Sequence, residues 1–238
     1  MEKVTKFSPQ IQEPVGQIPL FPTLVHYIHL ANFPKEELVK FAYDEKDKDS
    51  KGCVISNQGG WQSSSYLYSR YENIIKTTII DGCRPLFTNE DIFLENLIIN
   101  LTFWININHT DCYNHAHMHE GADMAGILWV KIPENSGQVE LYNSKSYENH
   151  RLDSVYSEDY KRKWGFYPSY LIPPNEGTII LFPAHVLHAV MPNHSKEDRI
   201  SIAFNVNLST EANFTLEDFP KGTTNNAKIT TCGATHEH

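Results

Sequence analysis

From about residue 97 the chain is a succession of short strand-like segments with no helical pattern between them. Within residues 97–108, every second side chain is apolar, as in Phe103, Ile105 and Ile107. The side chains between them are those of Trp104, Asn106 and Asn108. Further strand-like runs, bounded by Gly, Pro or Asn, lie at 125–132, 137–142, 177–182 and 199–208. Many short strands without intervening helices favour an antiparallel sandwich or barrel. We therefore expect a mainly β fold of the jelly-roll type.

The amino-terminal part has a different pattern and predicts a few flanking helices. Residues 17–30 indicate an edge strand that starts at prolines, 34–42 a short helix, 45–51 a charged loop and 71–86 a second helix. We predict a lead-in at 1–16, one domain at 17–208 and a tail at 209–238. Within that domain, 17–96 holds the first strand and helices, and 97–208 is the jelly-roll core. Residues 143–170 form a polar and aromatic insertion in that core, which we interpret as a candidate lid.

Charge and composition narrow the range of partners. The formal net charge of -9 disfavours nucleic acid, whose binding depends on Lys and Arg, and leaves a small molecule or a peptide as the expected substrate. No apolar run approaches the length of a membrane span and the amino terminus has no apolar signal core, so we expect a cytoplasmic protein without a membrane partner. The edge strand at 17–30 gives a possible homodimer contact.

Three histidines carry the strongest chemical signal. His117 and His119 are two apart, and side chains two apart on a strand project from the same face. His188, far along the chain, supplies a third imidazole, the commonest side-chain metal ligand. Three protein ligands leave coordination positions open, which indicates an enzyme rather than a structural metal site. His115 has the same strand parity and stays an alternative ligand at this point.

A second signal is the pair Arg199 and Ser201 at the start of the last predicted strand. A guanidinium can bind a carboxylate through two hydrogen bonds, and a hydroxyl two residues later on the same face adds a donor. The competing interpretation of Arg199 is a surface charge beside Glu197 and Asp198. Trp104 could line a pocket or belong to the core, and we favour the core.

These elements together resemble the 2-oxoglutarate/Fe(II) oxygenase superfamily. The resemblance covers roughly residues 17–208 and depends on Ser56–Ser63, the strand and turn from Trp104 to Asn114, the His-x-His motif and the block from Leu181 to Asn205. It is closest to a little-characterised branch with His-x-His in this place. It implies a double-stranded β-helix, Fe(II) and the cosubstrate 2-oxoglutarate.

Carried over by position, the resemblance makes His117 and His188 iron ligands and places His119 in the third ligand position. It makes Arg199 and Ser201 the anchor for the C5 carboxylate of 2-oxoglutarate. Asn106 and Asn114 are expected to donate hydrogen bonds to the cosubstrate or to orient a ligand histidine.

The third ligand departs from the common pattern, because most of the superfamily has Asp or Glu where this chain has His119. Glu120 and Asp123 therefore remain alternative ligands. The expected activity is a dioxygenase that uses molecular oxygen to hydroxylate a peptidyl or small-molecule C–H bond, with release of succinate and CO2. The alternatives are a three-histidine cupin-type metalloenzyme that does not use 2-oxoglutarate, and a non-catalytic jelly-roll binding module. A dicarboxylate anchor at Arg199 and Ser201 favours the first of the three.

Overall fold

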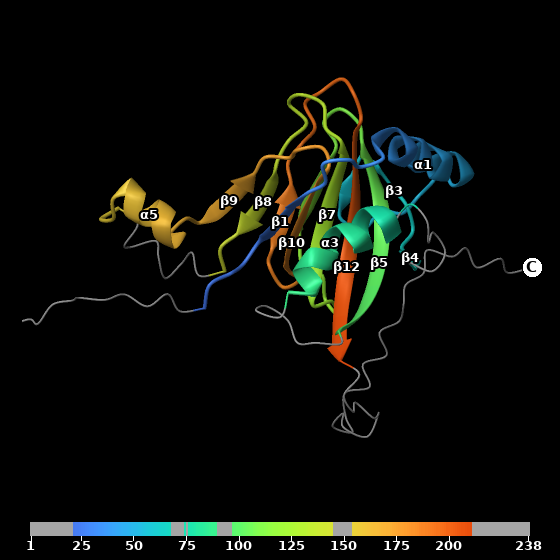
Figure 1. Cartoon of the computed structure of the whole chain (residues 1–238). Coiled ribbons are helices and arrows are strands. Elements are labelled where there is room, and N and C mark those ends of the chain that lie inside the picture. Colours follow the sequence, from blue (N-terminus) through green and yellow to red (C-terminus); the bar gives the residue numbers. More distant parts are fainter. Residues whose placement is uncertain (1–20, 68–73, 75, 90–96, 145–153, 211–238) are drawn as a thin grey trace, which may run out of the picture.

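Two antiparallel sheets form the centre of the molecule (Figure 1). The computed structural model describes residues 21–67, 74, 76–89, 97–144 and 154–210. The major sheet has the strand order β1 (His26–His29), β10 (Thr178–Pro183), β7 (Met124–Lys131), β12 (Arg199–Thr210), β5 (Leu97–Asn108) and β3 (Trp61–Gln62), and β4 (Tyr66–Leu67) also pairs with β5. The minor sheet has the order β2 (Asn57–Gln58), β6 (Tyr113–His117), β11 (His188–Val190), β8 (Val139–Tyr142) and β9 (Ser169–Ile172). This arrangement is a double-stranded β-helix, as expected.

The outer face of the major sheet is apolar and covered by helices. Along β5 and β12, every second side chain faces α1 (Lys35–Lys48) and α3 (Asp81–Phe87) and is almost completely buried: Leu101, Phe103, Ile105, Ile107, Ile200, Ile202, Phe204 and Val206. Leu38 and Ala42 of α1 and Cys83 of α3 belong to the same cluster. The period-2 pattern of the two strands therefore produces the main hydrophobic core.

The opposite face of the major sheet looks toward the minor sheet and is divided in two. Near β10, β8 and β9 it forms a second apolar cluster: Ala125, Ile127, Trp129, Val139, Leu141, Ile172, Ile180, Phe182 and Val186. Near β5 and β12 the same face carries polar side chains that are nevertheless buried, including Asn106, Asn108 and Arg199. Buried polar groups need partners, so this region is where a ligand pocket is expected.

The helices differ in part from the sequence expectation. The first helix does not stop before residue 45: α1 continues to Lys48, so the predicted charged loop at 45–51 is wrong for its first half. Glu45 is buried on the same face as Leu38 and Ala42 and pairs with Lys48, which explains the continuation. The second helix is a π-helical turn (η2, Lys76–Ile80) followed by α3, with residues 71–73 and 75 outside the described part. Among the described helices, each is too short or too polar to span a membrane.

The strand predictions at 97–108, 125–132, 137–142, 177–182 and 199–208 correspond to β5, β7, β8, β10 and β12, with small shifts at the ends. The edge strand expected at 17–30 is shorter: in the described part only β1, at His26–His29, is strand, and it does lie at the edge of the major sheet.

In its described part, the insertion at 143–170 holds α5 (Glu158–Trp164) and the start of β9, and in Figure 1 α5 projects away from the sheets. Its aromatic rings, Tyr156, Tyr160, Trp164 and Phe166, pack against one another. The predicted lead-in at 1–16 and residues 211–238 of the predicted tail at 209–238 fall outside the described residues, whereas Ser209 and Thr210 still belong to β12. The domain boundaries stay predictions.

Candidate metal centre and adjoining pocket

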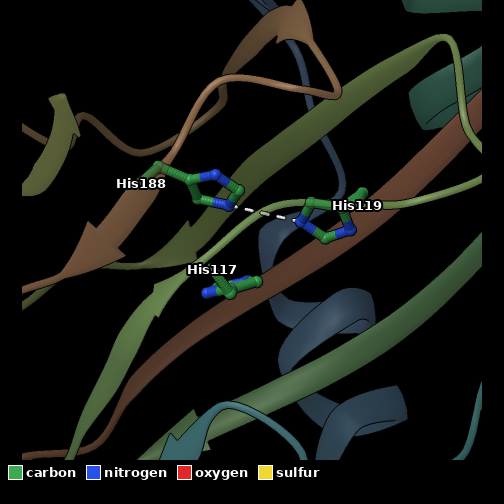
Figure 2. A group of neighbouring side chains, drawn as sticks. All are labelled: His117, His119 and His188. Carbon is green, nitrogen blue, oxygen red and sulfur yellow. Dashed lines mark hydrogen bonds between the residues drawn. The ribbon is translucent and has the colours of Figure 1, made fainter. Parts of the chain in front are cut away.

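The three predicted histidines converge in the structure (Figure 2). His117 ends β6, His188 begins β11, and His119 lies in the loop after β6. One potential ligand atom from each ring lies within 4.8 Å of the others, and Nε2 of His119 is 3.2 Å from Nε2 of His188. His188 is buried, and the other two are half-buried. Three imidazole nitrogens around one point form a set that suits Fe, Zn, Cu or Ni.

A β-bulge in β6 decides which histidines face inward. His117 pairs with His188, but the next register pair is Asn114 with Val190, so β6 has one residue more than β11 between them. The extra residue breaks the period-2 alternation. Asn114 and His117 therefore both point inward although they are three apart, and His115 is exposed. His115 is excluded from the cluster by this bulge, which a regular strand would not predict.

His119 reaches the cluster by a route other than the predicted one. The sequence expectation placed His117 and His119 on one strand face, but β6 ends at His117 and His119 lies in the loop. Its backbone N–H donates to the carbonyl of Ala184 at 3.0 Å, and the backbone N–H of Ala184 donates to Asp123 O at 3.1 Å. These bonds fix the loop against the end of β10. The ring also stacks against Trp104 with centroids 5.5 Å apart.

The three rings are kept neutral and oriented. Burial lowers the pKa of His119 to about 3 and that of His188 to about 4, with repulsion among the three rings adding to the effect, and burial also lowers the pKa of His117. Nδ1 of His117 is 2.6 Å from His115 O, and Nδ1 of His188 is 2.9 Å from Val186 O. A carbonyl only accepts, so Nδ1 carries the proton in both rings and Nε2 keeps its lone pair for a metal.

The carboxylate alternatives to His119 do not join the cluster. Asp123 accepts the backbone N–H of Leu208 at 2.7 Å through Oδ2, and Glu120 is exposed. Among the described residues, the group of His, Cys, Asp and Glu side chains able to share one metal here consists of the three histidines. His185 is exposed and lies outside the group.

Arg199 is buried, so its interpretation as a surface charge is wrong. Only 2% of the residue is exposed, although Glu197 precedes it in an exposed turn. Nη1 donates to the carbonyls of Ser136 and, at 2.9 Å, Met191. Nε and Nη2 are buried and have no partner among the described residues. Burial lowers the pKa of Arg199 to about 10, which still leaves it charged at neutral pH.

One pocket joins the buried guanidinium to the histidine cluster. All seven residues proposed from the sequence line it: Ser201, Asn106, Asn114, Arg199, His117, His119 and His188. Oδ1 of Asn106 is buried and has no partner within the described part of the chain. The Asn114 amide, in contrast, accepts a hydrogen bond from Asn108 at 3.5 Å and donates one to Ser56 at 3.2 Å. The described residues of the insertion 143–170 do not line the pocket, and its role as a lid stays a prediction.

Two residues of the site were missed or misplaced by the sequence analysis. Trp104 lines the pocket, so its expected core position is wrong: on β5 it shares the inner face with Asn106. Asn205 was not singled out, yet it shares the inner face of β12 with Arg199 and Ser201, and its side chain is close enough to His119 to raise the pKa of that ring. Strand parity with Arg199 could have identified Asn205 from the sequence.

The comparisons with known proteins agree with this geometry. Residues 102–205, which contain the three histidines, Arg199 and Ser201, match the family model described as putative 2OG-Fe(II) oxygenase. The expected resemblance is thereby confirmed, as are the double-stranded β-helix fold and, for the family, the pair of Fe(II) and 2-oxoglutarate. Comparison with curated proteins gave no match.

Among solved structures, the chain is similar to a prolyl-4-hydroxylase from Pseudomonas putida, with 13% identity, a TM-score of 0.50 and coverage of 76% of this chain and 91% of the other. It is also similar to the non-haem α-ketoglutarate-dependent carbocyclase SnoK of nogalamycin biosynthesis, with 9% identity, a TM-score of 0.51 and coverage of 76% and 78%. A third similar structure is HygX from Streptomyces hygroscopicus, crystallised with nickel and 2-oxoglutarate, with 12% identity, a TM-score of 0.48 and coverage of 78% and 82%.

Proposed function

We propose that this protein is a non-haem Fe(II)- and 2-oxoglutarate-dependent dioxygenase that hydroxylates a C–H bond of a peptidyl or small-molecule substrate. The observation that carries the proposal is the buried, incompletely paired guanidinium of Arg199 in the same pocket as three converging imidazoles. A buried charge without a counterion is costly, and a dicarboxylate supplies one. The matching family model points to the same cosubstrate.

The donor set fits an iron ion. The three histidines offer neutral Nε2 atoms, and three protein ligands leave positions for a bidentate 2-oxo acid and for oxygen. When bound, Fe(II) couples the oxidative decarboxylation of 2-oxoglutarate by molecular oxygen to oxidation of the substrate C–H bond, with succinate and CO2 as products. Because the three ligands are neutral, the protein contributes no negative charge to the metal, unlike a site with an Asp or Glu ligand.

The residues of the chain would bind and orient the cosubstrate. Arg199 would bind the C5 carboxylate of 2-oxoglutarate through Nε and Nη2, while Nη1 donates to the Ser136 and Met191 carbonyls. Two fixed hydrogen bonds hold the guanidinium plane, so the free edge faces one direction. Ser201, two residues along the same face of β12, would add a hydroxyl donor.

The other pocket residues would position the ligands and exclude water. The Asn114 amide is hydrogen-bonded to Asn108 on β5 and to Ser56 beside β2. These two hydrogen bonds would hold the start of β6 in place against the major sheet. Asn106 offers an amide beside Ser201, its register partner on β12. The Trp104 and Phe182 rings flank His119 and His188, so the metal would sit against apolar surface that keeps bulk water away.

A three-histidine metalloenzyme without 2-oxoglutarate is the alternative that shares the same ligands. It has no need of a buried guanidinium facing the metal pocket, and this is the feature that favours the dioxygenase.

The deciding experiment is an anaerobic titration of the Fe(II)-loaded protein with 2-oxoglutarate, followed by visible absorption. A metal-to-ligand charge-transfer band is expected, since the 2-oxo acid would chelate the iron. Iron binding without the band would favour the three-histidine enzyme, and the lack of iron binding would favour a non-catalytic module.

A further inference from the structure

The three candidate ligands are not supported in the same way. For His117 and His188, the backbone carbonyl two residues earlier accepts the Nδ1 proton and directs Nε2 inward. For His119, no backbone carbonyl of the described residues does this. Its Nε2 already points to His188, and Figure 2 shows its other ring nitrogen directed away from that residue. His119 therefore needs an acceptor of another kind behind its ring.

Asn205 lies where that acceptor is needed. It is on the inner face of β12, paired with Ala125 of β7 on one side and with Thr102 of β5 on the other. Its Oδ1 is buried and has no hydrogen-bond partner of ordinary geometry among the residues that the structure describes. The His119 ring stacks against Trp104, whose register partner on β12 is Ala203, two residues before Asn205 on the same face. Asn205 is therefore the next inner-face residue of β12 beside the ring, and in agreement with this its side chain raises the pKa of His119 against the effect of burial.

We propose that Asn205 is the positioning residue of His119, with Oδ1 accepting the Nδ1 proton when a metal binds at Nε2. This inference rests on the metal site of the proposed function. With this contact, all three candidate ligand rings would have a hydrogen-bond acceptor at Nδ1. Such an acceptor selects the tautomer whose Nε2 lone pair is free for the metal. Two acceptors are backbone carbonyls and cannot be replaced by mutation, whereas the third is a side chain.

The choice of an amide also has a consequence for charge. A carboxylate at position 205 would accept the same proton but would add a negative charge behind the ring and make the imidazole a stronger donor. An amide selects the tautomer and leaves the ligand set neutral. Asn205 therefore controls the orientation of His119 and keeps the site free of protein negative charge at the same time.

The test uses Co(II) as the probe and the full-length protein under anaerobic conditions. Binding is measured by competition with a chelator and by the visible d–d spectrum. Asn205→Leu keeps the approximate shape but removes the acceptor, Asn205→Asp keeps the acceptor and adds charge, and Asn100→Leu is the matched control at an exposed asparagine of the neighbouring strand. NMR of the Co(II) protein follows the exchangeable, paramagnetically shifted imidazole N–H protons.

We expect Asn205→Leu to weaken Co(II) binding by about 10–100-fold, the usual effect of losing a partner behind a metal ligand. One shifted N–H signal should then exchange rapidly with water, while the two signals protected by carbonyls remain. Asn205→Asp should bind Co(II) more tightly than the unmodified protein, and Asn100→Leu should be unchanged.

The possible failures can be told apart. If the unmodified protein binds Co(II) but Asn205→Leu matches it in affinity and keeps all three N–H signals, the inference is overturned and the proposed function stands. If Asn205→Asp loses as much affinity as Asn205→Leu, the residue has only a packing role and the inference is also overturned. If the unmodified protein does not bind Co(II), both proposals fall.

Discussion

His117 and His188 lie directly opposite each other across the ladder between β6 and β11, with ring centroids 4.4 Å apart. Each ring is oriented through its Nδ1 by the carbonyl two residues earlier, that of His115 in β6 and that of Val186 in the turn before β11. His119 approaches the same point from a loop held by Ala184. The candidate site therefore consists of a rigid pair of histidines and a third histidine whose position depends on a loop.

The first prediction tests which histidines are metal ligands. His188→Ala and His119→Ala should each weaken Fe(II) binding by more than the ~10–100-fold expected from loss of an outer hydrogen bond. His119→Asp should retain binding, since a carboxylate at this position restores the common two-histidine, one-carboxylate set. Calorimetric or chelator-competition titration of each variant measures the effect.

His115→Ala is the matched control, because the bulge in β6 leaves the His115 ring exposed and outside the cluster. This substitution should leave Fe(II) affinity unchanged. Normal Fe(II) affinity in His119→Ala would place the third ligand elsewhere, with Asp123 the residue to examine next.

The second prediction concerns the anchor. Arg199→Leu should severely weaken 2-oxoglutarate binding and leave metal affinity nearly intact, since the guanidinium enters the pocket from β12 and is not one of the three candidate metal ligands. Loss of one partner of a buried charge pair costs about 2–5 kcal/mol, which corresponds to roughly 30- to 5,000-fold in affinity. The measurement is the charge-transfer titration, repeated with Arg199→Lys, which keeps the charge but loses the planar pair of donors.

Because Arg199 also holds the Ser136 and Met191 carbonyls, a thermal melt must accompany each variant. Cosubstrate affinity that is unchanged in folded Arg199→Leu contradicts the anchor assignment.

Most of the fold was predictable because its signals are local. The alternation along β5 and β12 specifies one apolar and one polar face, and both faces appear where the pattern places them. The short strands β2, β3 and β4 have two residues each, too few for any periodicity to be visible. The continuation of α1 to Lys48 depends on burial of Glu45 against the rest of the molecule, which a charge-rich sequence does not reveal.

The site was predictable in its residue types and less so in its geometry. His117, His119, His188 and Arg199 could be named from spacing and resemblance, and they do line one pocket. The bulge that turns His115 outward results from pairing with β11, a contact between segments some 70 residues apart. The burial of Arg199 likewise depends on carbonyls of distant loops, so its neighbours Glu197 and Asp198 pointed to the wrong interpretation.

The third prediction concerns pH. The pKa values of His119 and His188 are lowered to about 3 and about 4 and that of His117 is also lowered, mainly by burial, from an ordinary value of 6.5. The unfolded chain therefore binds more protons than the folded chain below pH 6.5. The stability of the metal-free protein should be complete above that pH and should fall as the pH decreases toward 4.

Urea unfolding of the metal-free protein at a series of pH values measures this dependence. The variant with glutamine at all three positions should show a clearly smaller decrease in unfolding free energy on acidification, while His115→Gln should behave like the parent protein. An equal decrease in the triple variant would show that the acid sensitivity arises elsewhere.

The fourth prediction tests the packing that supports the pocket from behind. Phe204 of β12 pairs with Gly126 of β7, and a Cβ placed on Gly126 would overlap the Phe204 ring. Phe204 is fully buried beneath the helices and cannot move outward without disturbing the core. Gly126→Ala should therefore destabilise the protein by about 1–3 kcal/mol, the usual cost of overpacking.

Denaturant unfolding of Gly126→Ala, Phe204→Leu and the double variant forms a cycle that isolates the contact. Phe204→Leu alone should be destabilising because it opens a cavity, and the double variant should be more stable than the sum of the two single effects predicts, because the added methyl group enters the space that the ring leaves. Strictly additive effects would mean that the ring and the glycine do not compete for the same volume, and the close approach of β12 to β7 would then need another cause.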